Sequence, residues 1–579
     1  MATHDIILRG GLVFDGSGAA PREMDVAVDG GVITGMGKVN GKGREEIDAR
    51  GQIVTPGFVD VHTHYDGQAT WGSEISPSSL HGITTAVMGN CGVGFAPCRT
   101  EDHDRLIRLM EGVEDIPFPV LTEGLPWAWE SFPDYLDFLG EREFDVDLAA
   151  QLPHAALRVY VMGDRGANRE DATPAEIKEM ARLAKEAVMA GAIGFSTSRT
   201  LNHRTSDGQP TPTLTASEAE LTGIAMGLAE AKRGVLQFVS DFNDPRKEAA
   251  MLRRIVEASG RPLSVSLAQA DVAPEGWRAL LGAIEEAVDD GLPMAAQVAP
   301  RPVGVLLGLE LTLNTFSAHP VFREVANLPF EEKVRRLNDA DFRKRLLADK
   351  PDTDNPFLQV MLRSFGKIFQ LSDPVDYEPG PERTIEAIAA QRGVSNEEAA
   401  LDLMLERDGH GVLYLPFLNY AQGSLEPIRA MMESTATLPG LSDGGAHVGM
   451  ICDGSFTTTM LTHWARDRSR GPKLPLEYLI HRQTQKTARW MGFNDRGLIA
   501  PGYRADLNVI DASNMKLHLP EVIHDLPAGG RRLMQRASGY TATILAGQVT
   551  HRDGDPTGAK PGRLVRGAQA APTRAMAAE

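Results

Sequence analysis

The chain has 579 residues and carries 59 Lys and Arg against 78 Asp and Glu, a formal net charge of -19. Hydrophobic residues make up 42% of the chain and charged residues 24%, which excludes a mainly disordered protein and supplies apolar material for a large core. This excess of acidic residues argues against electrostatic binding to nucleic acid or to anionic lipid, and we expect neither nucleic acid nor a membrane as a partner.

The cysteine content and the N-terminal sequence bear on the compartment. Three cysteines are too few for a disulfide framework, which favours a reducing environment. No basic segment followed by an apolar run opens the chain, and no run of about 18 apolar residues occurs anywhere in it. We therefore expect a cytoplasmic protein.

Both ends of the chain have short β-type runs separated by glycine turns. Such runs predict strands at 5–9, 11–14, 25–29, 32–36, 508–511 and 541–545. We expect a β-sandwich domain built from residues 1–56 plus 497–556. The last stretch, 557–579, is rich in Ala, Gly, Pro and Arg, and we expect a flexible tail there.

The middle of the chain alternates strand-like and helix-like segments about eight times, which is typical of a parallel sheet, either a closed (β/α)8 barrel or an open doubly wound sheet. Helices are predicted at 174–190, after Asp171-Ala-Thr, and at 216–232, where Thr215 and Glu218 form a capping-box pattern. Strands are predicted at 58–64, 84–90, 147–151, 193–197, 235–239, 263–267, 294–298 and at a last segment ending near Asp443.

No GxGxxG follows an early strand, which disfavours a dinucleotide-binding sheet. The alternation stops between residues 301 and 410. We therefore expect a barrel domain over 57–496 with a helical insertion at about 301–410, of the kind that often lies over the mouth of a barrel.

One strand ends in a His-x-His pair, in the run Gly57-Phe-Val-Asp-Val-His62-Thr-His64. Side chains two apart on a strand point the same way, so both imidazoles are directed to one place at the carboxyl end of this strand. Parallel barrels keep their chemistry at that end, and two neutral imidazoles suit Zn²⁺ or a similar metal. The alternative is two unrelated polar residues.

Three landmarks in this sequence resemble the amidohydrolase superfamily. Residues 56–64 resemble its first barrel strand, 495–511 the passage from barrel to sheet domain, and 6–18 its opening. Within the superfamily the chain is most similar to the N-acyl-D-amino-acid deacylases, in 82–97, 191–198 and 441–445. The resemblance implies an α/β fold: a TIM-type barrel, a composite β-sandwich from both termini and a helical insertion.

The same resemblance implies a metal centre formed by His62, His64, Cys91 and Asp443, with Asp443 as the catalytic residue that takes a proton from the attacking water. The implied cofactor is Zn²⁺ or another divalent transition metal, one ion per chain, with two as the alternative. On the residues alone, Cys91 can equally be a small buried thiol and Asp443 part of an Asx turn before two glycines.

The chain also departs from the deacylases. The predicted fifth and sixth strands lack the metal-binding histidines that these enzymes have there, and Gln237 and Gln269 lie near the expected positions. Residues 195–199 contain no lysine that could be carboxylated. Substrate-binding candidates are these two amides together with Arg199, His203 and His447.

We expect a hydrolase of carbon–nitrogen bonds other than peptide bonds. Its expected substrate is a small linear amide, an N-acyl (D-)amino acid or a related N-acyl compound. The alternatives are a cyclic-amide hydrolase of the hydantoinase kind and a non-catalytic scaffold that has lost its metal site. A homo-oligomer is expected from base rates. The sequence specifies neither the acyl group, the stereochemistry nor the metal.

Overall fold

Eight parallel strands form the central sheet of the protein in the computed structural model, which describes residues 3–361 and 364–573. Residues 1–2 of the expected sheet domain, 362–363 of the expected insertion and 574–579 of the expected tail lie outside this description. The strands follow chain order around the sheet: β6 Phe58–Asp60, β7 Ile83–Met88, β8 Asp147–Pro153, β9 Gly194–Arg199, β10 Val235–Ser240, β11 Leu263–Leu267, β12 Met294–Val298 and β16 Thr437–Pro439.

The first and last strands meet just beyond their carboxyl ends, which nearly closes the sheet into a barrel. The backbone N–H of His64 donates to the carbonyl of Gly444 at 2.8 Å, and that of Asp443 donates to the carbonyl of His62 at 3.2 Å. Ser442 Oγ adds hydrogen bonds to the Asp60 carboxylate and, at 3.0 Å, to the carbonyl of His62. These bonds join residues about 380 positions apart in the chain at one edge of the barrel.

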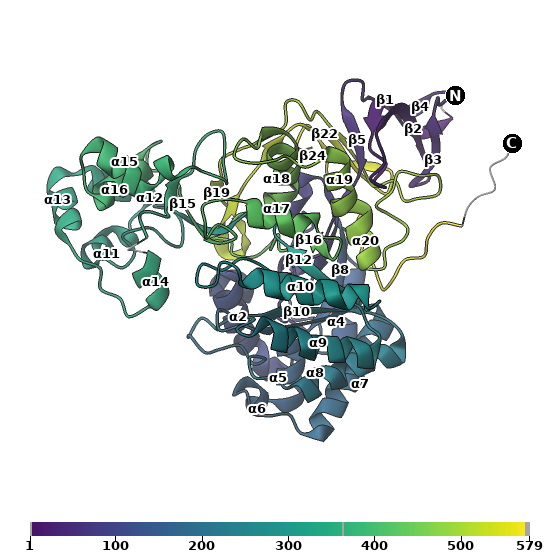
Figure 1. Cartoon of the computed structure of the whole chain (residues 1–579), viewed down its shortest axis with the longest axis horizontal. Coiled ribbons are helices and arrows are strands. Elements are labelled where there is room, and N and C mark those ends of the chain that lie inside the picture. Colours follow the sequence, from purple (N-terminus) through teal and green to yellow (C-terminus); the bar gives the residue numbers. More distant parts are fainter. Residues whose placement is uncertain (1–2, 362–363, 574–579) are drawn as a thin grey trace.

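Helices connect successive strands and cover the outside of the barrel (Figure 1). Thr173 caps α7 in a capping box with Glu176, and the helix has the predicted bounds. The other predicted helix begins later than expected, because its N-cap is Ser217 rather than Thr215. The larger helices of this layer are α2 His103–Glu114, α4 Phe132–Gly140, α5 His154–Met162, α7 Pro174–Ala190, α8 Glu218–Ala231, α9 Pro245–Ser259, α10 Gly276–Asp289, α17 Glu426–Glu433 and α19 Leu476–His481.

Strands from both ends of the chain form a second sheet, as expected. It has nine strands with its own apolar core, in the order β24-β23-β22-β17-β5-β1-β2-β3, with β4 paired to β1. It lies at one end of the barrel (Figure 1). The strands are β1 His4–Val13, β2 Arg22–Asp29, β3 Val32–Gly37, β4 Gly43–Asp48, β5 Ile53–Pro56, β17 Leu507–Ile510, β22 Tyr540–Leu545, β23 Gln548–Arg552 and β24 Asp555–Pro556.

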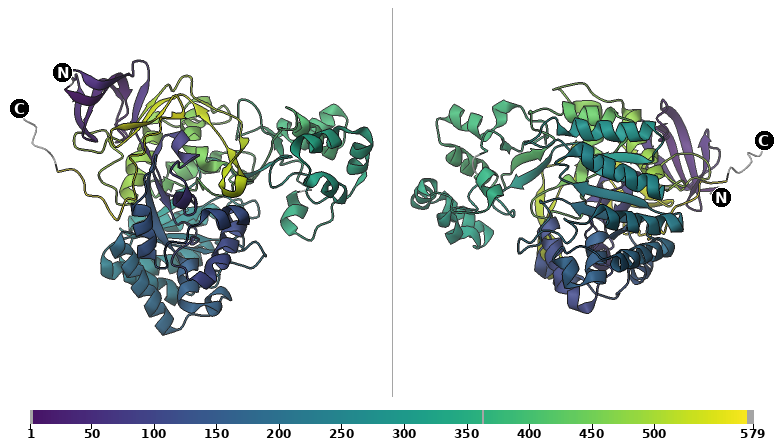
Figure 2. Two further views of the ribbon diagram at one scale, coloured as in Figure 1. Left: turned by 180° about the vertical axis from the view of Figure 1, so that it is seen from behind. Right: turned by 60° about the horizontal axis from the view of Figure 1, so that its bottom comes forward.

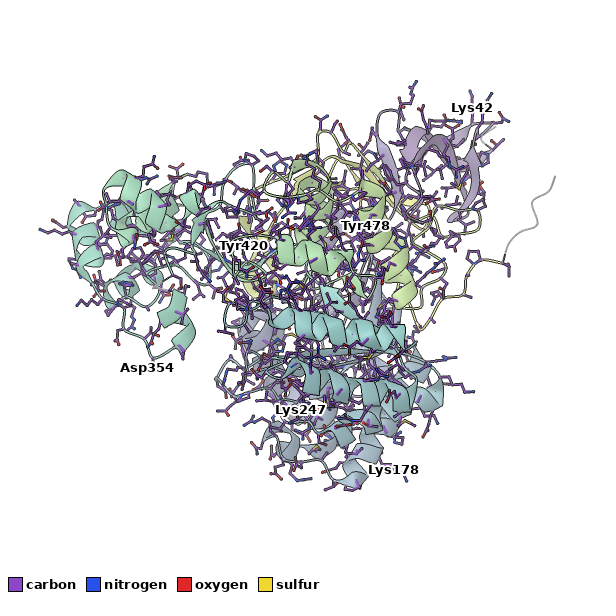
Figure 3. All side chains as sticks on the ribbon, viewed as in Figure 1. Lys42, Lys178, Lys247, Asp354, Tyr420 and Tyr478 are labelled. Carbon is purple, nitrogen blue, oxygen red and sulfur yellow. The ribbon has the colours of Figure 1, made fainter. Side chains whose placement is uncertain are left out.

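A largely helical insertion projects sideways from the barrel and has a hydrophobic core of its own (Figures 1 and 2). A three-stranded sheet joins it to the barrel, and β15 extends it beyond residue 410. Figure 3 places Asp354 far out on this lobe and Tyr420 where the lobe meets the barrel. Its elements are β13 Val303–Leu307, α11 Pro320–Ala326, α12 Phe330–Asn338, α13 Ala340–Ala348, α14 Pro356–Met361, β14 Phe369–Gln370, α15 Ile385–Arg392, α16 Asn396–Leu405 and β15 Leu413–Leu418.

The expectation of a flexible tail from residue 557 is wrong for its first part. The backbone of Gly562 pairs with Phe144, and that of Leu564 pairs with Leu148 of β8. Val565 is buried in an apolar cluster at the barrel. Composition suggested mobility because few residues there are large and apolar, but backbone hydrogen bonds hold this segment in place.

None of the helices in the described part of the chain is long and apolar enough to cross a membrane.

Candidate metal centre

Four side chains from three loops converge at the carboxyl end of the barrel. His62 and His64 follow β6, Cys91 follows β7 and Asp443 follows β16. The ligand atoms of the two imidazoles and the thiol lie within 4.8 Å of one another. Asp443 Oδ1 is 3.4 Å from His62 Nε2 and 3.7 Å from His64 Nε2. The His-x-His spacing therefore directs both rings to one point, where the second and eighth strands add a sulfur and a carboxylate.

Gln297 of β12 fixes the orientation of His62. Its amide nitrogen donates to Ser264 Oγ at 3.0 Å, so its oxygen accepts from His62 Nδ1 at 2.7 Å. A proton on Nδ1 leaves the Nε2 lone pair directed at Cys91 and Asp443. Burial lowers the pKa of His62 to about 4, which keeps this ring neutral at physiological pH.

Cys91 lies at a sharp turn after β7, with a positive φ of 54°. Its backbone N–H donates to Gln237 Oε1 of β10 at 3.1 Å, and the next N–H donates to Ser196 Oγ of β9 at 2.9 Å. The thiol is 3.3 Å from His62 Nε2. Burial raises the pKa of this thiol to about 12, so a nearby cation is needed to hold it as a thiolate at neutral pH.

Several buried polar atoms of this cluster have no hydrogen-bond partner among the described residues: both ring nitrogens of His64, Asp443 Oδ1 and Glu114 Oε2. Buried polar groups are nearly always satisfied, so such a concentration at one point needs an explanation. Two imidazoles, a thiol and a carboxylate form a donor set suited to a borderline-soft divalent cation. The residues present therefore fit a transition-metal ion.

Asp443 borders a narrow pocket of about 20 Å³, with room for about one water molecule. Arg532 and Leu533 line its other side. Burial alone would raise the pKa of Asp443, but the side-chain interaction with His64 and the nearby imidazoles of His62 and His447 outweigh it and leave the pKa well below its ordinary value. The carboxylate is thus ionised at neutral pH.

Glu114, the last residue of α2, lies against this cluster. It was not among the site residues predicted from the sequence. Its side chain is 1% exposed, with Oε1 3.3 Å from His64 Nδ1 and Oε2 3.6 Å from His447 Nε2. His447 Nε2 is also 3.9 Å from Asp443 Oδ2. Nothing in the local sequence distinguishes Glu114 from the surface acids of the same helix, because its burial depends on the loop after the eighth strand.

Two further candidates are in or beside the cluster. His203 Nδ1 forms a 2.8 Å hydrogen bond with Ser198 Oγ, and burial lowers the pKa of this imidazole to about 3, so it is neutral. Gln237 uses its oxygen to hold the Cys91 loop, while its buried Nε2 lacks a partner among the described residues. Both remain candidates for contact with a substrate.

The contacts of Arg199 and Gln269 correct the roles expected for them. Along β9, Ser196 and Ser198 face the barrel interior, so Arg199 lies on the opposite face, where its Nη1 contacts Met251 of α9 at 3.3 Å. Gln269 has a structural role, because its Oε1 accepts from the backbone of Ala421 at 3.1 Å and its Nε2 donates to the carbonyl of Pro274 at 3.0 Å. Neither side chain is directed at the four converging residues.

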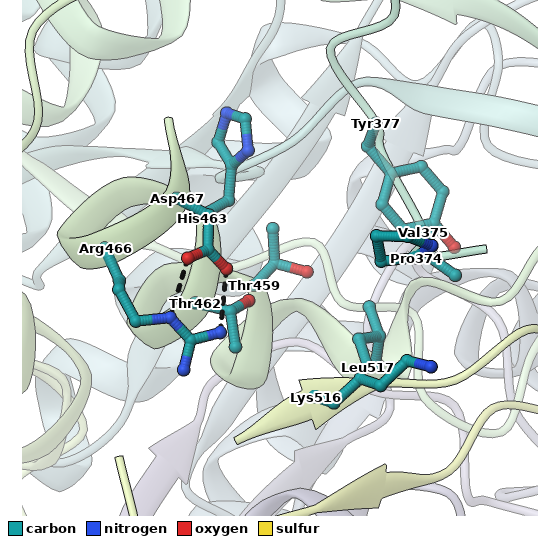
Figure 4. Close-up of a pocket in the computed structure, with 10 residues that line it drawn as sticks. All are labelled: Pro374, Val375, Tyr377, Thr459, Thr462, His463, Arg466, Asp467, Lys516 and Leu517. Carbon is teal, nitrogen blue, oxygen red and sulfur yellow. Dashed lines mark hydrogen bonds and ion pairs between the residues drawn. The ribbon is translucent and has the colours of Figure 1, made fainter. Parts of the chain in front are cut away.

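A larger pocket of about 80 Å³ lies elsewhere, between the insertion, the π-helical segment Met460–Asp467 and Lys516 (Figure 4). None of the four converging residues lines it. Its ionisable groups already have partners: Arg466 lies 2.6 Å from Asp467, Lys516 lies 2.9 Å from Asp373 and His463 lies 3.0 Å from Glu378.

Comparison with known proteins identifies the family of this chain. Residues 45–551 match the amidohydrolase family. An N-acyl-D-aspartate deacylase of Alcaligenes xylosoxydans is 27% identical over 589 residues, covering 99% of this chain and 97% of the relative. A D-aminoacylase crystal structure, 24% identical, superposes with a TM-score of 0.62 over 97% of this chain and 100% of its own.

The N-acyl-D-glutamate deacylase of Bordetella bronchiseptica, solved with zinc and a phosphonate inhibitor, is also 24% identical, with a TM-score of 0.62 over 97% of this chain and 99% of its own. The barrel, the composite sheet and the family match together define the class: this chain belongs to the amidohydrolase family. The expected fold class is thereby confirmed, as is the expected enzyme class, a metal-dependent hydrolase of carbon–nitrogen bonds other than peptide bonds.

Proposed function

We propose that this enzyme hydrolyses the linear amide bond of an N-acyl amino acid, with the D configuration as first choice. The observation that carries the proposal is the convergence of His62, His64, Cys91 and Asp443 on one point at the carboxyl end of the barrel. Relatives that act on N-acyl-D-aspartate and N-acyl-D-glutamate support this substrate class.

We propose one divalent transition-metal ion per chain, with zinc as the first candidate. His62, His64 and Cys91 would hold it and Asp443 would touch it, and water or substrate would enter as a fifth ligand. The positions of the usual strand-five and strand-six histidines offer no alternative ligands: Gln237 is a poor metal ligand and Gln269 is occupied by backbone groups. When bound, such an ion polarises an amide carbonyl and acidifies a water molecule.

The proposed reaction assigns distinct roles to this chain's own residues. Asp443 Oδ1, ionised at neutral pH, accepts the proton of the attacking water and returns it to the departing nitrogen. His62 is kept in one tautomer by Gln297. Gln237 Nε2, buried and lacking a partner in the described chain, can donate to a substrate oxygen, and we retain His203 and His447 as further substrate contacts.

Neither alternative function is favoured by the site. A hydantoinase-like site would draw on a carboxylated lysine, and β9 has none. A scaffold without a metal would have no use for four convergent donors with unsatisfied buried atoms.

We further propose a cytoplasmic homo-oligomer acting on small molecules, which is consistent with three free cysteines and a charge of -19.

Activity against matched D and L substrates tests the proposal. A panel of N-acetyl- and N-formyl-amino acids in both configurations is incubated with enzyme that has been metal-depleted or reloaded with zinc, and free amine is measured. We expect hydrolysis of at least one D substrate by the reloaded enzyme alone. Asp443→Asn should lower kcat by about 10²- to 10⁴-fold, the usual contribution of a proton-transferring group.

Two outcomes would overturn the proposed function. Hydrolysis of hydantoins but of no linear amide would favour the cyclic-amide enzyme. Full activity of Asp443→Asn on the best substrate would show that proton transfer does not depend on this carboxylate.

A further inference from the structure

Glu114 is a buried carboxylate at the metal centre that the proposed reaction does not use. Helix α2 ends at this residue, and the next one, Asp115, has a left-handed backbone with φ 52°. A carboxylate in the last turn of a helix faces the negative end of the helix dipole, and burial removes its hydration as well. Both effects oppose folding, so the carboxylate at this position needs a reason other than stability.

The geometry around His64 supplies that reason. The two nitrogens of this ring face different carboxylates: Nε2 faces Asp443 Oδ1 at 3.7 Å and Nδ1 faces Glu114 Oε1 at 3.3 Å. His62 is arranged similarly, but its Nδ1 forms a 2.7 Å hydrogen bond with the neutral amide of Gln297, whereas the contact of His64 Nδ1 with Glu114 is an ion-pair approach without hydrogen-bond geometry. Each imidazole thus has one nitrogen at the shared point and an acceptor behind the other.

Glu114 also connects this ring to the loop that carries Asp443. Its Oε2 is 3.6 Å from His447 Nε2, and its backbone carbonyl accepts from the backbone N–H of His447. The neighbouring Asp115 accepts from the backbone N–H of Gly449 at 3.0 Å. The end of α2 therefore contacts both His64 and residues 447–449, four to six positions after Asp443.

We propose that Glu114 is a positioning residue of the metal centre, whose carboxylate holds His64 through Nδ1 and the Asp443 loop through His447. The role rests on the proposed metal site. An outer carboxylate of this kind fixes the tautomer and orientation of a ligand histidine and raises its basicity. The Glu114 carboxylate therefore makes Nε2 of His64 a stronger electron donor to the metal than Nε2 of His62, whose Nδ1 faces the neutral amide of Gln297.

Zinc affinity of Glu114→Gln tests this role. The variant keeps the size of the side chain and removes its charge, and Asp104→Asn removes a charge from the exposed face of the same helix as a control. Affinity is measured by competition with a chromophoric chelator on the full-length protein. We expect Glu114→Gln to bind zinc about 10- to 100-fold more weakly and Asp104→Asn to match the wild type.

Two further readouts separate positioning from other roles. The melting temperature of metal-free Glu114→Gln should equal or exceed that of the wild type, because the buried charge opposes folding; a clear loss would mean that Glu114 is structural. At zinc saturation the X-ray absorption spectra of both proteins should show the same ligand set, and loss of an oxygen ligand would make Glu114 a direct ligand and overturn the proposal.

Equal zinc affinity of Glu114→Gln and wild type would also overturn this role while leaving the metal centre intact. If the wild type itself binds no zinc, the proposed function fails first, so the two failures are distinguishable.

Discussion

At the scale of single residues, the chemistry of the site depends on which atom of each side chain remains free. Gln297 occupies Nδ1 of His62, which leaves Nε2 available. Gln237 holds the backbone of Cys91 and leaves its sulfur available. Asp443 keeps Oδ1 free of hydrogen bonds to the described residues. The neutral amides of Gln297 and Gln237 thus orient His62 and Cys91 without adding charge to the site.

The thiol of Cys91 provides a spectroscopic prediction. In cobalt-substituted protein, a cysteine ligand should give a near-ultraviolet thiolate-to-metal absorption band that Cys91→Ser lacks. The variant should also bind zinc more weakly, by more than the roughly 10- to 100-fold typical of losing an outer partner. Cys98→Ser is the matched control, since Cys98 is buried nearby in sequence but its thiol contacts the carbonyl of Arg99 instead.

Persistence of the thiolate band in Cys91→Ser would exclude Cys91 as a ligand. The band's absence from the wild type would do the same.

At the scale of elements, the loop after β7 is the most constrained part of the site. Gly89 has a φ of +78°, and a Cβ there would lie 2.2 Å from the carbonyl oxygen of Gln151 on β8. Asn90 accepts a 2.8 Å hydrogen bond from Gln151, and its own amide donates to the carbonyls of Thr63 and Val87. These contacts tie the loop to the first and third strands, which sets the position of Cys91.

A methyl group at Gly89 should therefore disturb both stability and metal binding. We expect Gly89→Ala to lower the free energy of unfolding by about 2 kcal/mol or more and to weaken zinc binding, measured by chemical denaturation and chelator competition. Gly51→Ala is a matched control, since Gly51 has a φ of +77° with no atom within 4 Å of its Cβ position. Equal losses in both variants would mean that backbone conformation alone, and not the approach to β8, constrains this loop.

At the scale of the whole molecule, much of the architecture could be predicted from alternation of strand and helix patterns and from three family landmarks. All eight barrel strands overlap predicted segments, because short runs of mainly small or apolar residues alternate with helix-like stretches. The His-x-His pair could likewise be predicted, since a spacing of two fixes the direction of both side chains.

Long-range contacts account for what the sequence could not predict. Glu114 is buried where residues 447–449 pack against the end of α2, and the side-chain oxygen of Gln269 is occupied by the backbone N–H of Ala421, which follows β15 of the insertion. Arg199 faces the helical layer because side chains alternate between the two faces of β9. The sequence predicts strand boundaries only to within about a residue, so it could not decide which face Arg199 occupies. The tail at 562–565 pairs with β8 through backbone groups, which composition does not reveal.

Metal content per chain tests the central claim most directly. Full-length protein loaded with zinc, freed of loosely bound ions by gel filtration and measured by elemental analysis should hold about one zinc per chain. His62→Ala, treated in parallel, should hold none. Two tightly held ions in the wild type, or one zinc retained by His62→Ala, would contradict a single centre built on His62, His64, Cys91 and Asp443.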